Sequence, residues 1–185
     1  MNIREFTFKV KKVYDEMSET FSSYQSQTGL KCLPNCGRCC QNPDVEASVM
    51  EMLPLALKIY DEGKLDEWLL KLETTKQKHC LLFVPTGGEG EGRCGSYNER
   101  PSVCRMFGVA GTFDKHHQVT LSVCKYIKEK QPELTKVDIS TPLIPEWTSI
   151  LSTIDPELTQ KKVPMNEAIT KALEHVAFYA QYQEL

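Results

Sequence analysis

The stretch Cys32-Leu-Pro-Asn-Cys36-Gly-Arg-Cys39-Cys40 places four cysteines within nine residues. Four more follow, so that the chain of 185 residues carries eight: the later ones are Cys80, Cys94, Cys104 and Cys124. Gaps of two or three residues let thiolates on one tight loop converge on a common point, as in zinc and iron–sulfur sites. A disulfide network is a poor alternative, because such short spacings strain many pairings. We therefore predict that all eight cysteines are metal ligands.

Length and composition are those of an ordinary globular domain. Hydrophobic residues make up 41% of the chain, charged residues 25%, and the net charge is −3; a chain this long buries a core without cross-links. We expect a single domain over residues 1–185, with a metal-binding core at 30–125 and helical flanks at 1–29 and 126–185. The small net negative charge argues against a nucleic-acid partner. No apolar run is long enough to span a membrane, so no membrane association is expected.

The expected compartment is the cytoplasm. The opening residues, MNIREFTFKVKK, carry charges and lack the apolar stretch of a secretory signal. Cytoplasmic thiols are kept reduced, so eight cysteines need a purpose other than disulfide formation, and metal binding is the commonest one.

Basic residues flank the cysteines. Five of the eight have a lysine or arginine as direct neighbour: Lys31, Arg38, Arg93, Arg105 and Lys125. A site of four thiolates carries net negative charge with either zinc or an oxidised four-iron cluster, and nearby cations offset that charge and lower thiol pKa values. The alternative interpretation is that these are solvated surface charges.

The adjacent pair Cys39-Cys40 constrains the geometry of the site. Neighbouring side chains point to opposite faces of a strand and diverge by about 100° on a helix. The pair can therefore serve one cluster of several irons, or two separate centres. Eight thiolates equal two complete four-cysteine sites, and the sequence does not assign the partners.

The pattern outside the cysteines predicts a mainly α fold with a small irregular α+β cysteine-rich metal-binding centre. Apolar residues at steps of three and four predict a helix over 3–24 that ends before Gly29. A second helix is expected through 47–52, with Asp44 as its cap and Pro54 ending or restarting it. Further helices are expected at 65–76, 146–154 and 166–183. Strands are expected at 81–84, 109–113 and 119–123, the last two as a hairpin with its tip at 114–117.

Over residues 30–125 the chain resembles the bacterial CxxCxxCC cysteine-cluster family of zinc- or iron-chelating domains, often described as iron–sulfur-cluster-containing proteins. The matching segments are Cys32-x3-Cys36-x2-Cys39-Cys40, Cys80-Leu-Leu-Phe83, Gly92-Arg-Cys94-Gly-Ser-Tyr97, Arg100-Pro-Ser-Val-Cys104-Arg-Met-Phe107 and Cys124. Leu81 departs from the proline that the family usually has after this cysteine. The resemblance implies a metal or iron–sulfur site. One branch of the family includes flagellin lysine methylases, but those proteins are much longer, so the resemblance gives little support to that activity here.

Two arginines near Cys104 are candidates for cofactor binding. Arg100 and Arg105 could donate guanidinium hydrogen bonds to cluster sulfur or to a substrate anion. The alternative is that they lie on the surface beside a capped helical turn. The sequence identifies no catalytic residue.

Two classes of function fit these features. In the first, an iron–sulfur cluster, with a four-iron cluster as the leading candidate, carries out redox or electron-transfer chemistry on a partner protein or a small substrate. In the second, zinc stabilises a non-catalytic interaction module. Thiolates suit both metals, but eight thiols exceed what one structural zinc uses and favour the cluster. A radical-SAM-like or protein-methylase-type enzyme is the weakest alternative, because a helix and not a strand precedes the Cys32-x3-Cys36-x2-Cys39 motif.

Overall fold

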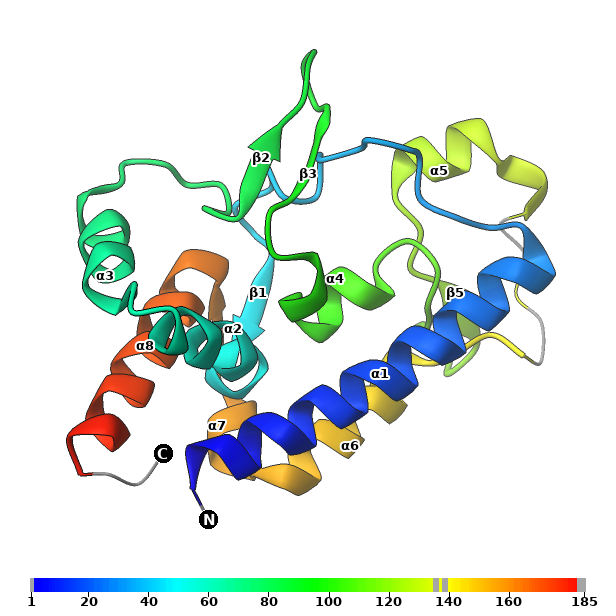
Figure 1. The fold of residues 1–185 in the computed structure, drawn as a ribbon. Helices are drawn as coiled ribbons and strands as arrows, with labels where there is room; N and C mark the ends of the chain where they lie inside the picture. Colours follow the sequence, from blue (N-terminus) through cyan, green and yellow to red (C-terminus); the bar gives the residue numbers. More distant parts are fainter. Residues whose placement is uncertain (1, 135–136, 138–139, 183–185) are drawn as a thin grey trace.

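The computed structural model describes residues 2–134, 137 and 140–182. The fold is mainly α-helical with minor β structure, as predicted (Figure 1). Its helices are α1 (Ile3–Thr28), α2 (Val49–Asp61), α3 (Leu65–Thr74), α4 (Ser102–Met106), α5 (Lys125–Lys130), α6 (Ile144–Ile154), α7 (Pro156–Gln160) and α8 (Met165–Gln181), with 3-10 turns at Tyr97–Glu99 and Pro132–Leu134. Its strands are β1 (Glu46–Ser48), β2 (Phe83–Pro85), β3 (Gly92–Cys94), β4 (Gly111–Phe113), β5 (Val119–Leu121) and β6 (Lys162–Pro164).

Helix α1 follows its predicted apolar face and ends where glycine allows it to end. Val10, Met17 and Phe21 are buried along that face. Gly29 adopts a left-handed conformation (φ 74°), and its N–H donates to the Gln25 carbonyl at 2.9 Å. This is the usual glycine helix cap. The helix is four residues longer than the periodicity predicted, and it ends before Gly29 as expected.

Helix α2 corrects two predictions. Its cap is Ser48, which forms a reciprocal capping box with Glu51, and not Asp44. Pro54 was expected to end or restart the helix, but it lies inside a continuous α2. The helix is buried on most sides, so tertiary packing outweighs the backbone hydrogen bond that proline removes.

The strands form three two-stranded antiparallel sheets in the described part of the chain. The predicted hairpin is present as β4 and β5, with Thr112 opposite Thr120. Strand β2 begins at Phe83 and pairs with β3, which the sequence did not indicate. Strand β1 pairs with β6 across more than 100 residues, so no local pattern could predict it. These sheets are unlike the parallel βα units that a radical-SAM barrel needs.

The buried side chains form two hydrophobic clusters. The α2–α8 core is built around Leu53, Leu57, Ala168, Ala172 and Leu173, and the α1–α6 core around Val10, Tyr14, Met17, Trp147 and Leu151. Figure 1 shows the segments that carry the cysteines between and above these two groups of helices. Among the described residues, no helix is both long and apolar enough to span a membrane.

Candidate metal centre

Seven of the eight cysteines line a single cavity of about 790 Å³. They come from the loop after α1, the segment before β2, strand β3 and helix α4: Cys32, Cys36, Cys39, Cys40, Cys80, Cys94 and Cys104. Cys124 is not part of this lining and lies at the N-cap position, directly before α5. All eight thiols are free of disulfides. The fold therefore gathers most of the predicted ligands around one space.

The donor chemistry of the cavity suits a metal that binds sulfur. Among the described residues that line it there is no Asp, Glu or His, whereas Arg93, Arg100 and Arg105 are present. Soft thiolates select zinc and iron–sulfur clusters, while magnesium and calcium take oxygen ligands. The positive charge of these arginines has the sign that offsets thiolate charge. The residues thus fit either zinc or an iron–sulfur cluster.

The thiols are spread over the cavity walls. Within the described residues, no three His, Cys, Asp or Glu side chains converge closely enough to hold one metal ion. The Cys39 and Cys40 thiols do contact each other through a hydrogen bond. The arrangement is therefore not a preformed tetrahedron around a single point.

The loop that carries the first four cysteines lies against the β2–β3 hairpin. Cys36 forms an isolated antiparallel bridge with Glu91, and the Gly37 N–H donates to the Gly90 carbonyl at 2.9 Å. These contacts join the first cysteine cluster to the chain just before Cys94. Segments more than 50 residues apart in sequence are held side by side by backbone hydrogen bonds.

A close approach explains the glycine in this loop. A Cβ atom added at Gly37 would lie 2.3 Å from the ring of Phe83, so no larger residue fits without a shift. The left-handed backbone of the loop is at Asn35 (φ 54°) instead. Gly37 therefore allows the loop to pack on β2, and Asn35 makes the turn.

Asn166, at the start of α8, holds Cys80 from both sides. Its Oδ1 accepts from the Leu81 N–H at 2.9 Å, and its Nδ2 donates to the His79 carbonyl at 2.9 Å. The Cys80 N–H donates to the Cys40 carbonyl at 3.1 Å. A single amide thus fixes the backbone of one predicted ligand to the α2–α8 core.

Helix α4, which carries Cys104, is fixed by a buried carboxylate. Glu51 Oε2 accepts from the N–H and hydroxyl of Ser48 at 2.8 and 2.9 Å. Its Oε1 accepts from the Ser102 N–H at 3.2 Å and from the Ser102 hydroxyl. One side chain therefore caps α2 and α4 together and sets the position of Cys104.

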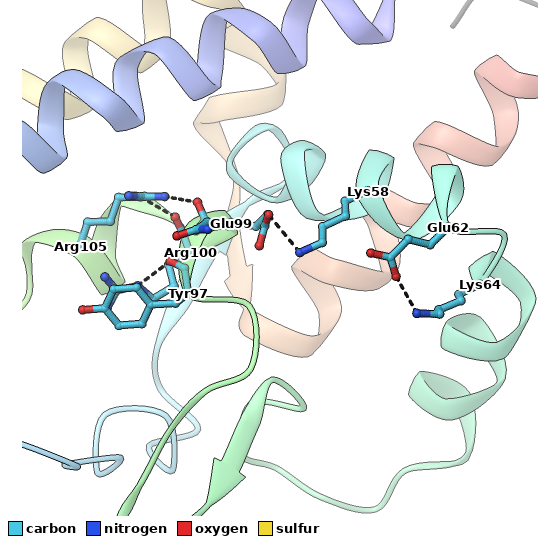
Figure 2. Close-up of polar contacts among 8 residues, drawn as sticks. Lys58, Glu62, Lys64, Tyr97, Glu99, Arg100 and Arg105 are labelled. Carbon is cyan, nitrogen blue, oxygen red and sulfur yellow. Dashed lines mark hydrogen bonds and ion pairs between the residues drawn. The ribbon is translucent and has the colours of Figure 1, made fainter.

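Arg105 connects α4 to α1. Its Nε donates to the Arg100 carbonyl at 2.9 Å, Nη1 to Ser18 Oγ at 2.7 Å, and Nη2 to the Asn98 carbonyl. The guanidinium also lies 4.4 Å above the centre of the Tyr14 ring. Figure 2 shows Arg105 reaching back to the backbone of this segment. Arg105 therefore connects α1 and α4, which form two walls of the cavity.

Arg100 lies over the Tyr97 ring, 3.3 Å from its centre. Its Nε donates to the Tyr97 carbonyl at 3.0 Å and Nη1 to the Cys104 carbonyl at 3.3 Å. The neighbouring Glu99 carboxylate pairs with Lys58 at 3.2 Å (Figure 2). The predicted cofactor contacts of Arg100 and Arg105 stay predictions; both side chains line the cavity where such contacts would be made.

Burial raises the pKa of most of these thiols. It raises the pKa of Cys32 to about 11, with further electrostatic contributions from Cys36, Cys39 and Cys124. It also raises the pKa of Cys80 to about 11. A bound metal cation would stabilise the thiolates and so lower these pKa values.

Cys39 differs from the other cysteines. The hydrogen bond from the Cys40 thiol lowers the pKa of Cys39 to about 6, with Arg100 lowering it further through its charge. The same hydrogen bond raises the pKa of Cys40 well above its ordinary value. Arg100 also opposes the increase that burial causes in the pKa of Cys94 and Cys104. The basic residue that acts on several thiols is therefore Arg100, which is adjacent to none of them in sequence.

Two of the basic residues beside cysteines meet at one tyrosine. Arg38 Nη1 donates to the Tyr126 hydroxyl at 3.1 Å, and its guanidinium lies 4.4 Å from the ring centre. The Lys125 ammonium lies 5.0 Å from the same ring. Arg38 thereby ties the first cysteine loop to α5, on which both Lys125 and Tyr126 lie, a role that the charge pattern alone did not indicate.

The family model of the CxxCxxCC family, described as a putative zinc- or iron-chelating domain, matches residues 31–134. The chain belongs to this family. Comparison with curated proteins and with solved structures gave no significant match. Membership in the CxxCxxCC family confirms the resemblance seen in the sequence and supports metal binding by the cysteine cluster.

Two residues that organise this centre were not found from the sequence. In the sequence, Glu51 resembles an ordinary helix-cap partner, and Asn166 resembles an ordinary residue at the start of a helix. Their partners at Ser102 and Leu81 lie 51 and 85 residues away. No local pattern could connect them, because the contacts exist only after the two cores have packed.

Proposed function

We propose that this chain is an iron–sulfur protein in which the cysteines around the cavity bind iron–sulfur cofactor, and that the protein serves electron transfer to a partner protein. The observation that carries the proposal is the spread of seven thiols around one cavity without any carboxylate or imidazole among its described lining residues. A zinc ion needs four sulfurs at about 2.3 Å from one point. A cluster has several irons, so that thiolates at different walls can each bind a different iron.

The surroundings also favour a redox role. When bound, an iron–sulfur cluster supplies one-electron transfer between a reduced donor protein and an oxidised acceptor. Arg93, Arg100 and Arg105 line the cavity, and positive charge favours the more negative reduced state. The free thiols suit a reducing compartment, and we infer a cytoplasmic location.

The zinc alternative rests on the same cysteines. Eight thiols can form two closed four-cysteine zinc sites, which would stabilise an interaction module without catalysis. The two functions differ in one property: only an iron–sulfur cluster accepts an electron.

The test is reduction of protein purified without exposure to air. We expect dithionite to bleach the visible absorbance and to produce an electron paramagnetic resonance signal that is lost on reoxidation. A matched sample loaded with zinc alone is the control. Protein that contains metal but shows neither change would exclude the electron-transfer function and favour the zinc module.

A further inference from the structure

The cysteines are attached to two different parts of the molecule. Cys80, Cys94 and Cys104 pack against the α2–α8 core, whereas Cys124 packs against the α1–α6 core. A single centre would have to draw ligands from both cores at once. The first cysteine loop also bonds to the β2–β3 hairpin at Glu91 and Gly90, but the helices on which the cysteine segments are anchored divide the eight residues into two sets.

The first set, which includes Cys32, Cys36 and Cys124, is attached to α5. Gln131 bonds both backbone groups of Lys31: its Nε2 donates to the Lys31 carbonyl at 3.0 Å and its Oε1 accepts from the Lys31 N–H at 3.4 Å. Seven residues later, Arg38 contacts Tyr126 near the other end of α5. Cys32 and Cys36 therefore lie on a segment that is pinned alongside α5 at both ends, and Cys124 begins that helix.

The second set is Cys40, Cys80, Cys94 and Cys104, and backbone hydrogen bonds connect the segments that carry the first three. The Cys80 N–H donates to the Cys40 carbonyl at 3.1 Å, and the Phe83 N–H donates to the Cys80 carbonyl at 3.1 Å. Phe83 in turn pairs with Cys94 in the β2–β3 sheet. Cys104 approaches from α4, which is fixed to α2 by Glu51.

We propose that the chain holds two metal centres: an outer one bound by Cys32, Cys36, Cys39 and Cys124, and an inner one bound by Cys40, Cys80, Cys94 and Cys104. Cys39 completes the outer set because the inner set already has four thiols. The adjacent pair Cys39-Cys40 then joins the two centres, since each of its members serves one of them. This inference rests on the proposed function only in requiring that the cysteines bind metal, because the division holds for clusters and for zinc.

The test compares two double variants of the full chain, purified and reconstituted without air. The outer variant is Cys32→Ala with Cys124→Ala, and the inner variant is Cys80→Ala with Cys104→Ala. Each should keep about half of the wild-type metal, and the variant with all four changes should keep essentially none. The control is His116→Ala, on the exposed tip between β4 and β5, which should keep all of it.

A measurement on the wild-type chain covers the case in which a variant fails to fold. Native mass spectrometry during a metal titration should show a half-loaded species between the empty and full forms. A single step from empty to full, or loss of all metal in both double variants, would overturn the two-centre inference. Stepwise binding of zinc at two centres, without sulfide, would support the two-centre inference and contradict the iron–sulfur function. Wild-type protein that binds no metal would contradict both.

Discussion

The carboxylate of Glu51 on α2 accepts a hydrogen bond from the backbone N–H of Ser102, at 3.2 Å, at the start of α4. Glu51 is buried and also caps α2 through Ser48. A buried carboxylate of this kind costs free energy unless its hydrogen bonds are made. The geometry around Cys104 is therefore coupled to the packing of α2, outside the cavity.

We expect Glu51→Ala to lower the free energy of unfolding by about 3 kcal/mol, because it leaves the buried N–H and hydroxyl groups of Ser48 and Ser102 without their acceptor. Urea unfolding of the metal-free chain measures the change. Glu62→Ala, an exposed carboxylate after the same helix, is the control and should have little effect. Equal stability of the Glu51 and Glu62 variants would contradict the role of Glu51.

Asn166 gives a second test of the scaffold. Asn166→Ala removes the acceptor for Leu81 and the donor for His79, so we expect it to lower the free energy of unfolding by about 2 kcal/mol. It should also weaken metal binding through Cys80. Glu167→Gln changes the next, exposed residue and its ion pair with Lys171, and should leave both properties unchanged. Metal affinity and urea unfolding are measured on both variants.

Sequence reasoning predicted the fold class and singled out the cysteines that the fold brings to one cavity, but not the contacts that hold them there. The spacing of Cys32 to Cys40 is local, as is the apolar face of α1, and both are readable from neighbouring residues. The pairing of β1 with β6 and the contacts of Glu51 and Asn166 join residues far apart in sequence. Their partners are set by tertiary packing, which also explains why Pro54 is tolerated inside α2.

The stability of the metal-free chain should fall in alkaline solution. Burial raises the pKa of Cys32 and Cys80 from 9.0 to about 11. A group whose pKa is higher in the folded state stabilises it below the unfolded pKa, and this contribution is lost as pH rises through the folded pKa. Urea midpoints measured from pH 8.5 to 11.5 should therefore fall across the upper part of this range. A flat profile would contradict the burial of these thiols.

Cys39 should be the most reactive cysteine of the metal-free chain at neutral pH. The hydrogen bond from Cys40 lowers the pKa of Cys39 to about 6, so most of it is thiolate at pH 7, and we expect alkylation roughly tenfold faster than at Cys80. Peptide mapping by mass spectrometry after brief iodoacetamide treatment measures this rate. Arg100→Gln should slow the reaction of Cys39. Preferential alkylation of Cys80 would contradict the assignment.

The most direct test of the central claim is the iron, acid-labile sulfide and zinc content of protein isolated without exposure to air. The account predicts a brown protein with iron and sulfide in equal amounts and broad absorbance at roughly 400 nm. Air must be excluded because exposed clusters are lost to oxygen and zinc then fills the thiolate sites. A colourless protein that contains zinc and no sulfide under these conditions would contradict the iron–sulfur assignment.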